Sequence, residues 1–255
     1  MDGRTGFLFP GGPDLYSPPQ KPLHLMAHLV KDEGVVLELR DHAETDRIVT
    51  VFTRYHGKLP ILVKGARRLT SGSGAYLDLA NRVGLIYYRR RGLSLLKEAS
   101  LIQTFSSLRE DLGKLEVALS GLILARDLLP ELQPQSEAYF LLLSFLRALD
   151  FGVAPRHLLL AFGLQFAKAL GYGPHLGGCV GCGGKEELTF SPERGGLLCQ
   201  KCGGEGEFLS PAFWRSLEAL QKLPLFAAGR VRLKDEEIER GLKLLQDFLA
   251  YQLKR

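Results

Sequence analysis

The chain has 255 residues, of which 45% are hydrophobic and 24% charged, and its formal net charge is +5. These values are ordinary for a globular protein, and the length allows one large domain or two to three small ones. No apolar run reaches the roughly 20 residues that span a bilayer, and Phe7-Leu8-Phe9 is too short for the apolar region of a signal peptide. We therefore expect an intracellular, cytoplasmic protein whose four cysteines stay reduced.

Residues 1–25 are rich in glycine and proline and show no apolar periodicity. This composition predicts a disordered or loosely held extension, because it offers little apolar surface to bury. We assign this extension no function.

Five segments between residues 26 and 105 are typical of β-strands, because apolar and β-branched residues alternate with polar ones and turn-forming residues separate the runs. These segments are residues 34–40, 47–53, 59–63, 75–89 and 93–104. Five short strands in so small a domain indicate a closed barrel. We therefore predict an OB-fold over residues 26–105 that binds nucleic acid. Another five-stranded barrel, such as an SH3-like one, is the alternative.

Positive charge is concentrated in residues 54–97, which hold ten basic residues and one acidic residue, Asp78. The local charge is therefore +9, whereas the whole chain carries +5, so the remainder is net negative. Such concentration favours a polyanionic partner, nucleic acid above all, over a merely solvated basic face. The candidate DNA-binding residues are Arg54, Lys58, Lys64, Arg67, Arg68, Arg82, Arg89, Arg90, Arg91 and Lys97.

Three tyrosines lie beside these basic residues in the sequence: Tyr55, Tyr87 and Tyr88. An exposed tyrosine ring can stack on a base of a single strand. Neighbouring residues of a strand point to opposite faces, so at most one of Tyr87 and Tyr88 can stack while the other lies in the barrel core. We take Tyr55 and Tyr88 as the candidates for base stacking.

From residue 106 onward the apolar period becomes that of helices. Ser107 and Glu110 form a capping-box pattern, which predicts that a helix begins there and runs to Pro130. Its apolar face would consist of Leu112, Leu115, Leu119 and Leu122.

Residues 137–151 are almost entirely apolar but too few to span a membrane, so we predict a buried central helix that Gly152 ends. A further helix should begin at Pro155 and end before Gly171. Two more should begin at residues 210–211 and at Asp235. We assign residues 106–176 and 207–255 to one helical domain beside the barrel. A groove for a partner peptide between the apolar helices is the alternative to plain core packing.

Four cysteines form two CxxC pairs, Cys179 with Cys182 and Cys199 with Cys202, separated by 16 residues. Each pair lets two thiolates converge on one ion, and two pairs complete a tetrahedral zinc site. Glycines follow each pair and allow the tight turns that such a site needs. We predict an inserted zinc ribbon over residues 177–206 with one structural Zn²⁺ per chain, because four protein ligands leave no open position. A disulfide or a redox CxxC is the disfavoured alternative, and His175 is expected to be a loop residue and no ligand.

Patterns that carry known chemistry are missing from the sequence: it has no phosphate loop of the GxxxxGK[ST] type, no GxGxxG after a strand and no GxSxG. Glu44 and Asp46 are expected to be turn-forming acids between strands and no metal site. We therefore expect a binding protein and no enzyme, with an enzyme of an unfamiliar site as the remaining alternative.

Two blocks of residues resemble the bacterial RecO family of recombination mediators. The first comprises residues 40–53 (RDHAETDRIVTVFT), 57–59 (GKL) and 64–68 (KGARR). The second comprises residues 169–176 (ALGYGPHL), the first cysteine pair and residues 190–199 (FSPERGGLLC). The similarity extends over residues 29–253, and this chain keeps all four cysteines, which not every family member does.

The resemblance implies an α+β protein with an N-terminal OB-fold, a helical domain and a zinc module. It also implies binding of single- and double-stranded DNA without sequence specificity and annealing of complementary strands. Work with RecR to load RecA onto strands coated by single-stranded-DNA-binding protein (SSB), in the RecFOR pathway of DNA repair and in association with the nucleoid, follows from the same resemblance. The alternative is an OB-fold interaction scaffold whose basic face binds a protein partner.

Overall fold

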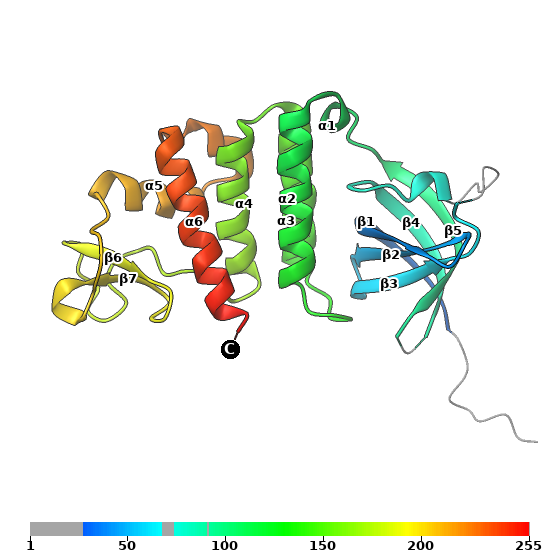
Figure 1. Cartoon of the computed structure of the whole chain (residues 1–255), viewed down its shortest axis with the longest axis horizontal. Helices are drawn as coiled ribbons and strands as arrows, with labels where there is room; N and C mark the ends of the chain where they lie inside the picture. The colour runs from blue at the N-terminus through cyan, green and yellow to red at the C-terminus, as the bar shows by residue number, and fades with distance from the viewer. Residues whose placement is uncertain (1–27, 68–73, 91, 255) are drawn as a thin grey trace, which may run out of the picture.

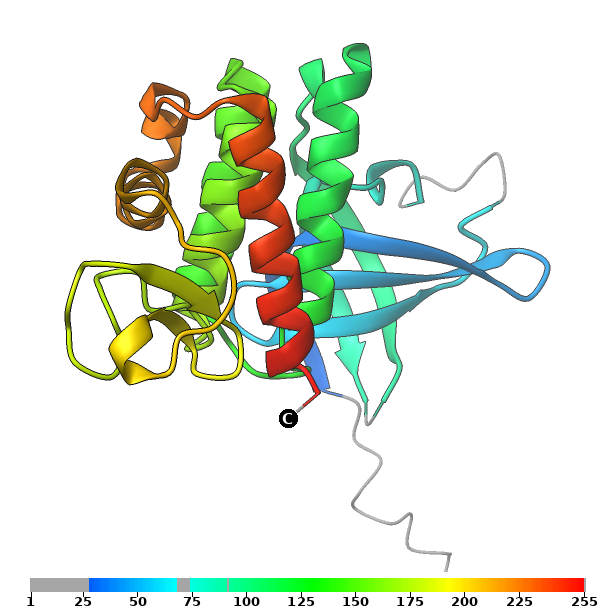
Figure 2. The same cartoon turned by 60° about the vertical axis from the view of Figure 1, so that its left-hand side comes forward.

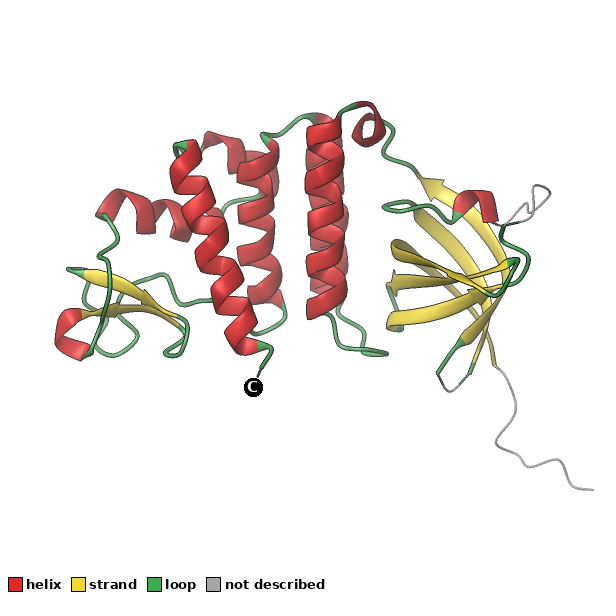
Figure 3. Ribbon diagram, viewed as in Figure 1, coloured by secondary structure: helices red, strands yellow, loops and turns green. Residues whose placement is uncertain are grey.

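The computed structural model describes residues 28–67, 74–90 and 92–254. A β-barrel, a layer of helices and a small module with the four cysteines follow one another along the long axis of the molecule (Figures 1 and 3). The predicted fold class, a mixed α+β chain with an N-terminal five-stranded barrel, is confirmed. The predicted extension at residues 1–25 lies outside the described part of the chain.

The barrel consists of β1 (His28–His42), β2 (Asp46–Thr53), β3 (Gly57–Val63), β4 (Arg82–Arg89) and β5 (Ser94–Gln103). It closes in the order β1-β2-β3-β5-β4, with β3 and β5 parallel and the other pairs antiparallel. A bulge between Val36 and Glu38 bends the long strand β1, so that it pairs with both β2 and β4. This is the topology of an OB-fold, as the strand pattern predicted.

One strand bound differs clearly from its prediction. The sequence pattern begins the fourth strand at residue 75, but β4 begins at Arg82. Residues before it form the short 3₁₀ helix η2 (Gly74–Tyr76) and a turn in which Ala80 has a φ of +66°. Leu77 is nevertheless buried in the barrel. The apolar residues of this turn are buried like those of a strand, so their pattern in the sequence resembles that of a strand.

The helical layer contains α1 (Ser107–Glu110), α2 (Leu112–Leu128), α3 (Ser136–Phe151), α4 (Pro155–Ala169), α5 (Pro211–Lys222) and α6 (Asp235–Gln252). The last four begin within a residue of the predicted positions, and α3 and α4 also end within a residue or so of them. Gly152 ends α3 with a φ of +99°, and the Ser210 side chain accepts a hydrogen bond from the Phe213 N–H at the start of α5. Local capping chemistry therefore determined these boundaries.

A helix begins at Ser107 as predicted, but it is the single turn α1, and the long helix α2 begins only at Leu112. The Ser107 hydroxyl lies 2.7 Å from the Asp150 carboxylate at the end of α3 and caps no helix. The helix breaks at Asp111, whose carboxylate accepts from the Lys114 N–H and caps α2 instead. Leu112 was predicted on the apolar face but is 82% exposed. The Ser107 side chain bonds to Asp150, which is remote in the chain, and therefore does not cap the helix. A pattern of local spacing does not detect such a remote partner.

The barrel and the helical layer share one apolar core. Phe52 of β2 is fully buried and packs edge to face on Tyr139 of α3, with ring centroids 5.6 Å apart. The start of β3 also fits closely against the loop after α2, since the Leu132 N–H donates to the Lys58 carbonyl at 2.9 Å. A Cβ on Gly57 would lie 2.2 Å from the Gln133 carbonyl oxygen. The two parts are thus joined by packing as well as by the chain.

The cysteine module contains the ribbon β6 (Leu188–Ser191) and β7 (Gly196–Cys199), followed by the 3₁₀ turn η3 (Gln200–Cys202). Leu188, Leu197 and Leu198 belong to the same core cluster as the helices, so the ribbon is packed onto the helical layer (Figure 2). Within the described residues, no helix combines the length and the apolar character needed to cross a membrane.

Candidate metal centre and nucleic-acid interface

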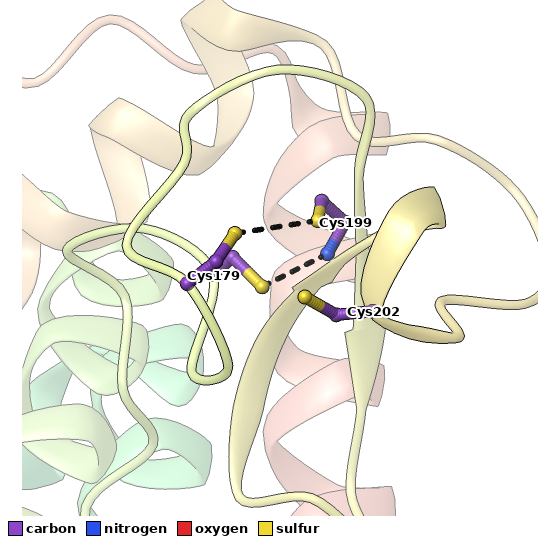
Figure 4. A group of neighbouring side chains, drawn as sticks. Cys179, Cys199 and Cys202 are labelled. Carbon is purple, nitrogen blue, oxygen red and sulfur yellow. Dashed lines mark hydrogen bonds between the residues drawn. The ribbon is translucent and has the colours of Figure 1, made fainter.

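The four cysteine side chains converge on one point, as the spacing predicted. Their Sγ atoms all lie within 4.8 Å of one another, and the Sγ atoms of Cys182 and Cys199 are 3.6 Å apart (Figure 4). Four thiolates around a tetrahedral zinc ion, at about 2.3 Å each, require sulfur–sulfur separations of roughly 3.8 Å. The four residues could therefore hold a metal ion.

The backbone around the sulfurs donates to one of them and leaves little room beside another. The N–H groups of Gly181 and Cys199 point at the Cys179 sulfur, at 3.4 and 3.3 Å. A Cβ on Gly181 would lie 3.1 Å from the Cys202 sulfur, so this position leaves little room for a side chain. Gly183 and Gly203 turn the chain after each pair with φ values of +75° and +90°.

The thiols of Cys179 and Cys202 do not share one pKa, because their surroundings differ. The N–H donors, that of Cys199 first, lower the pKa of the Cys179 thiol to about 6. The neighbouring thiols, that of Cys199 first, raise the pKa of Cys202 to about 12. Four close thiolates repel one another, and a divalent cation removes that repulsion. His175 is exposed and contributes its backbone to a pairing with Gly196, as expected for a loop residue.

The predicted DNA-binding residues fall into two classes in the structure. Arg54, Lys58 and Arg82 are partly buried where the barrel meets the helical layer. Lys64, Arg67, Arg89, Arg90 and Lys97 are exposed. Arg68 and Arg91 lie outside the described residues.

Arg54 and Arg82 share one carboxylate, that of Glu33. Arg82 Nη2 lies 2.8 Å from Glu33 Oε2, and Arg54 Nη1 lies 3.3 Å from Glu33 Oε1. The Arg54 guanidinium also lies over the rings of Tyr55 and Phe140, at 5.0 and 5.1 Å from their centroids. Both arginines therefore have structural partners within the chain.

Lys58 belongs to the contact between β3 and α2. Its ammonium donates to the Arg126 carbonyl at 2.6 Å, and burial lowers its pKa below the ordinary value. The Arg126 guanidinium in turn donates to Glu38 Oε1 at 2.8 Å, and Arg40 donates to the same oxygen at 3.0 Å. Burial alone would raise the pKa of Glu38, but the two guanidinium groups outweigh it, so this pKa lies below its ordinary value.

A groove of about 820 Å³ lies between the outer face of β1–β3, the β4–β5 hairpin and the end of α2. Its lining combines apolar, basic and acidic side chains: Glu38, Arg40, Ile48, Thr50, Lys58, Pro60, Leu93, Arg126, Asp127, Glu131 and Leu253. The face of strands 2 and 3 is where OB-folds bind oligonucleotides. Arg40 and Arg126 line this groove although both lie outside the basic stretch of the sequence. The alternation of β1 could have indicated Arg40, but nothing local pointed to Arg126.

Exposed cations lie at two places around the barrel. Lys64 and Arg67 follow β3, and the Arg67 N–H donates to the Thr45 carbonyl in the β1–β2 turn. Arg89 and Arg90 lie at the β4–β5 hairpin, with Lys97 on β5. Their bonding differs: Arg67 has a weak contact to Asp41 at 3.7 Å, while Lys64, Arg89, Arg90 and Lys97 form no ion pair among the described residues.

The tyrosines follow the predicted alternation. Tyr87 is fully buried in the barrel core, and Tyr88 on the opposite face is partly exposed. Tyr55 is 56% exposed beside Arg54. Asp46, which follows the β1–β2 turn, has a structural role: its carboxylate accepts from the Gly65 N–H at 2.8 Å, and this bond lowers its pKa.

Comparison with known proteins gives one consistent result. Residues 26–105 match the family described as "Recombination protein O N terminal", and residues 109–255 match "Recombination protein O C terminal". A protein named DNA repair protein RecO from Desulfatibacillum aliphaticivorans is 35% identical over 237 residues, covering 88% of this chain and 92% of the relative. Proteins of the same name from Symbiobacterium thermophilum and Exiguobacterium sibiricum are 34% and 36% identical over 222 residues each, covering 82% and 87% of this chain and 88% and 89% of the relatives. The chain therefore belongs to the RecO family.

Proposed function

We propose that this protein acts in DNA repair and recombination by binding DNA on its barrel without sequence specificity. The observation that carries this proposal is a closed OB-fold barrel that has a groove along strands 2 and 3 and two sets of exposed cations. Lys64 and Arg67 form one set, and Arg89, Arg90 and Lys97 form the other. Cations on a barrel face neutralise phosphates and release counterions, which gives affinity for any sequence.

The three partly buried cations have a different role in this proposal. Arg54, Lys58 and Arg82 already bond to Glu33 or to backbone of α2. We assign them to holding the barrel against the helical layer, and we assign phosphate contacts to the exposed set. Tyr88 remains a stacking candidate at the hairpin. Tyr55 is exposed beside Arg54 and would stack only on a strand that reaches that end of the barrel.

Annealing follows from binding without any covalent step. When cations screen the phosphates of two complementary strands, the repulsion between the strands falls and they meet more often. We further propose that the protein does this on strands coated by SSB, and that with RecR it promotes loading of RecA. Membership of the RecO family supports these partners. The protein would then be a mediator and no enzyme.

We also propose that the cysteine centre binds one structural Zn²⁺. The residues that would hold it are Cys179, Cys182, Cys199 and Cys202, and a closed set of four thiolates gives the ion no position for substrate. The ion would supply cross-linking of the two turns, and the protein supplies N–H donors to the Cys179 sulfur. Since the ribbon packs into the helical core, the ion would stabilise that whole end of the molecule.

The test is the salt dependence of affinity for a labelled single strand. Arg89→Ala with Arg90→Ala should weaken binding and flatten the slope of log affinity against log salt by roughly 0.7 for each lost contact. Lys168→Ala with Lys243→Ala, which removes two exposed cations of the helical layer, is the matched control and should leave the slope unchanged. Equal slopes for both variants would refute the barrel site. Annealing of strands coated by SSB then distinguishes a mediator from a general OB-fold protein.

A further inference from the structure

Two phenylalanine side chains at one end of the helical layer are exposed and in contact. Phe151, the last residue of α3, is 82% exposed, and Phe226 in the 3₁₀ helix η4 (Leu225–Arg230) is 50% exposed. Their ring centroids are 6.1 Å apart in an edge-to-face arrangement. The end of α3 and the chain entering α6 both lie at the top of the helical layer in Figure 1. Distant parts of the sequence thus meet to form this pair.

The exposure is built into the fold and does not result from a loose end. Gly152 ends α3 immediately after Phe151, and the next N–H, that of Val153, donates back to the Ala148 carbonyl at 3.0 Å. On the other side, Leu225 and Ala228 flank Phe226 and are buried. The other aromatic residues of α3 and α4, Phe140 excepted, are buried: Tyr139, Phe145, Phe162 and Phe166. Phe151 and Phe226 are therefore held outward by well-packed neighbours.

A row of cations follows Phe226 along the chain. Arg230, Arg232 and Lys234 are exposed, while Val231 and Leu233 between them pack against the core. Val231 and Lys234 have extended backbone angles, which puts alternate side chains on one side. Among the described residues, none of the three cations takes part in an ion pair.

Nearby acids are mostly engaged elsewhere. Glu237 accepts from the Lys234 N–H at 2.9 Å and caps α6, and Glu239 pairs with Arg156. Asp150 binds Ser107 on the side of α1. Asp235 and Glu236 are exposed in the first turn of α6, where the helix dipole favours them. In the part of the chain that the structure describes, no acid forms an ion pair with Arg230, Arg232 or Lys234, so these three cations can turn to a ligand.

We propose that Phe151, Phe226, Arg230, Arg232 and Lys234 form a second surface for single-stranded nucleic acid, separate from the barrel. Bases stack on exposed aromatic rings and the backbone follows a row of cations at such sites. Cations two residues apart on an extended chain are about 6.5–7 Å apart, close to two nucleotides of a stacked strand at about 3.4 Å each. This deepens and rests on the proposed function, because a protein that anneals strands gains by holding two of them at once.

The test measures how many single DNA strands one full-length protein chain binds. A short fluorescent oligothymidylate in excess is followed by sedimentation equilibrium, and a 5-bromouracil-substituted strand is cross-linked by light and mapped by mass spectrometry. We expect two strands per wild-type chain, with cross-links in a peptide that contains Phe151 or Phe226. The variant with Phe151→Ala, Phe226→Ala, Arg230→Gln and Arg232→Gln should bind one strand. Loss of the stacked base alone should weaken the second strand roughly fivefold or more.

The control variant combines Phe208→Ala with Lys168→Gln and Lys243→Gln, since Phe208 is 46% exposed and both lysines are exposed. It should still bind two strands. A wild-type protein that binds one strand, lost in the Arg89/Arg90 variant, would overturn this surface and leave the barrel site standing. Two strands that survive the four substitutions would also overturn it and leave the patch to a protein partner. A wild-type protein that binds no strand would overturn the barrel proposal as well.

Discussion

Arg126 of α2 donates to Glu38 of β1 at 2.8 Å, although 88 positions separate them in the chain. Arg40 binds the same carboxylate from the neighbouring position on the strand face. One acid thus holds two guanidinium groups at the edge of the groove where OB-folds bind oligonucleotides. Arg126 also pairs with Asp127 at 2.8 Å, so a DNA strand must compete with Glu38 for Arg40 and with both acids for Arg126.

Replacing Glu38 with Gln should therefore strengthen DNA binding. The substitution frees Arg40 for phosphate, while Arg126 keeps its bond to Asp127 at 2.8 Å, so the log–log salt slope for single-stranded DNA should steepen by roughly 0.7 when Arg40 engages one phosphate. The matched control is Glu98→Gln, which removes one exposed acid of β5 outside the groove. An equal gain in both variants would show a general charge effect. No gain in Glu38→Gln would mean that DNA does not enter the groove.

The same carboxylate makes stability depend on pH. The pKa of Glu38 is lower in the folded chain than its ordinary value of 4.5, so the folded state binds this proton less readily than the unfolded state. Its contribution is complete above about pH 4.5 and is lost as pH falls through the lower folded value. The difference in unfolding free energy between wild type and Glu38→Gln, measured by urea titration, should shrink toward low pH. A difference that is constant from neutral pH to below 4 would contradict the ion pair.

Gly57 reports on the fit between barrel and helical layer. Its φ is +76°, and a Cβ there would lie 2.2 Å from the Gln133 carbonyl oxygen. Gly92 has nearly the same φ, +79°, but no atom lies within 4 Å of the corresponding Cβ. Gly92→Ala should cost about 1–2 kcal/mol for the left-handed backbone alone, and Gly57→Ala should cost clearly more because the loop after α2 must also move. Equal midpoints of urea unfolding for the two variants would show that the loop after α2 moves away from residue 57 at little cost.

Metal content should depend on the cysteines and not on the nearby histidine. We expect one zinc per wild-type chain by elemental analysis, none after Cys199→Ser, and one after His175→Ala. Loss of the ion should also lower the stability of the helical layer, because the β6–β7 ribbon shares its core. Zinc that remains bound in Cys199→Ser with unchanged affinity would refute the four-thiolate site.

Local patterns determined much of this protein. Cysteine spacing fixes which sulfurs can converge, since each CxxC turn needs only its own backbone. Alternation along the strands separated Tyr87 inside the barrel from Tyr88 outside it, and Ser210 and Gly152 marked helix ends through contacts within one turn. For the strands and helix ends the deciding interaction lies within a few residues, and for the cysteines the repeated CxxC spacing marks both halves of the cluster, so the order of residues is enough to reveal them.

Only the tertiary structure decided which basic side chains are free to contact a ligand and which are paired with acids of the chain. Arg82 looks like the other cations of the basic stretch, but Glu33, 49 positions away, binds it and leaves its side chain only 18% exposed. Arg126 enters the groove, Ser107 leaves its cap for Asp150, and Phe151 meets Phe226, all through partners remote in the chain. Whether a cation faces solvent or an acid depends on how β1, α2 and α3 pack together. That packing follows from the shared apolar core and is not visible in residue spacing.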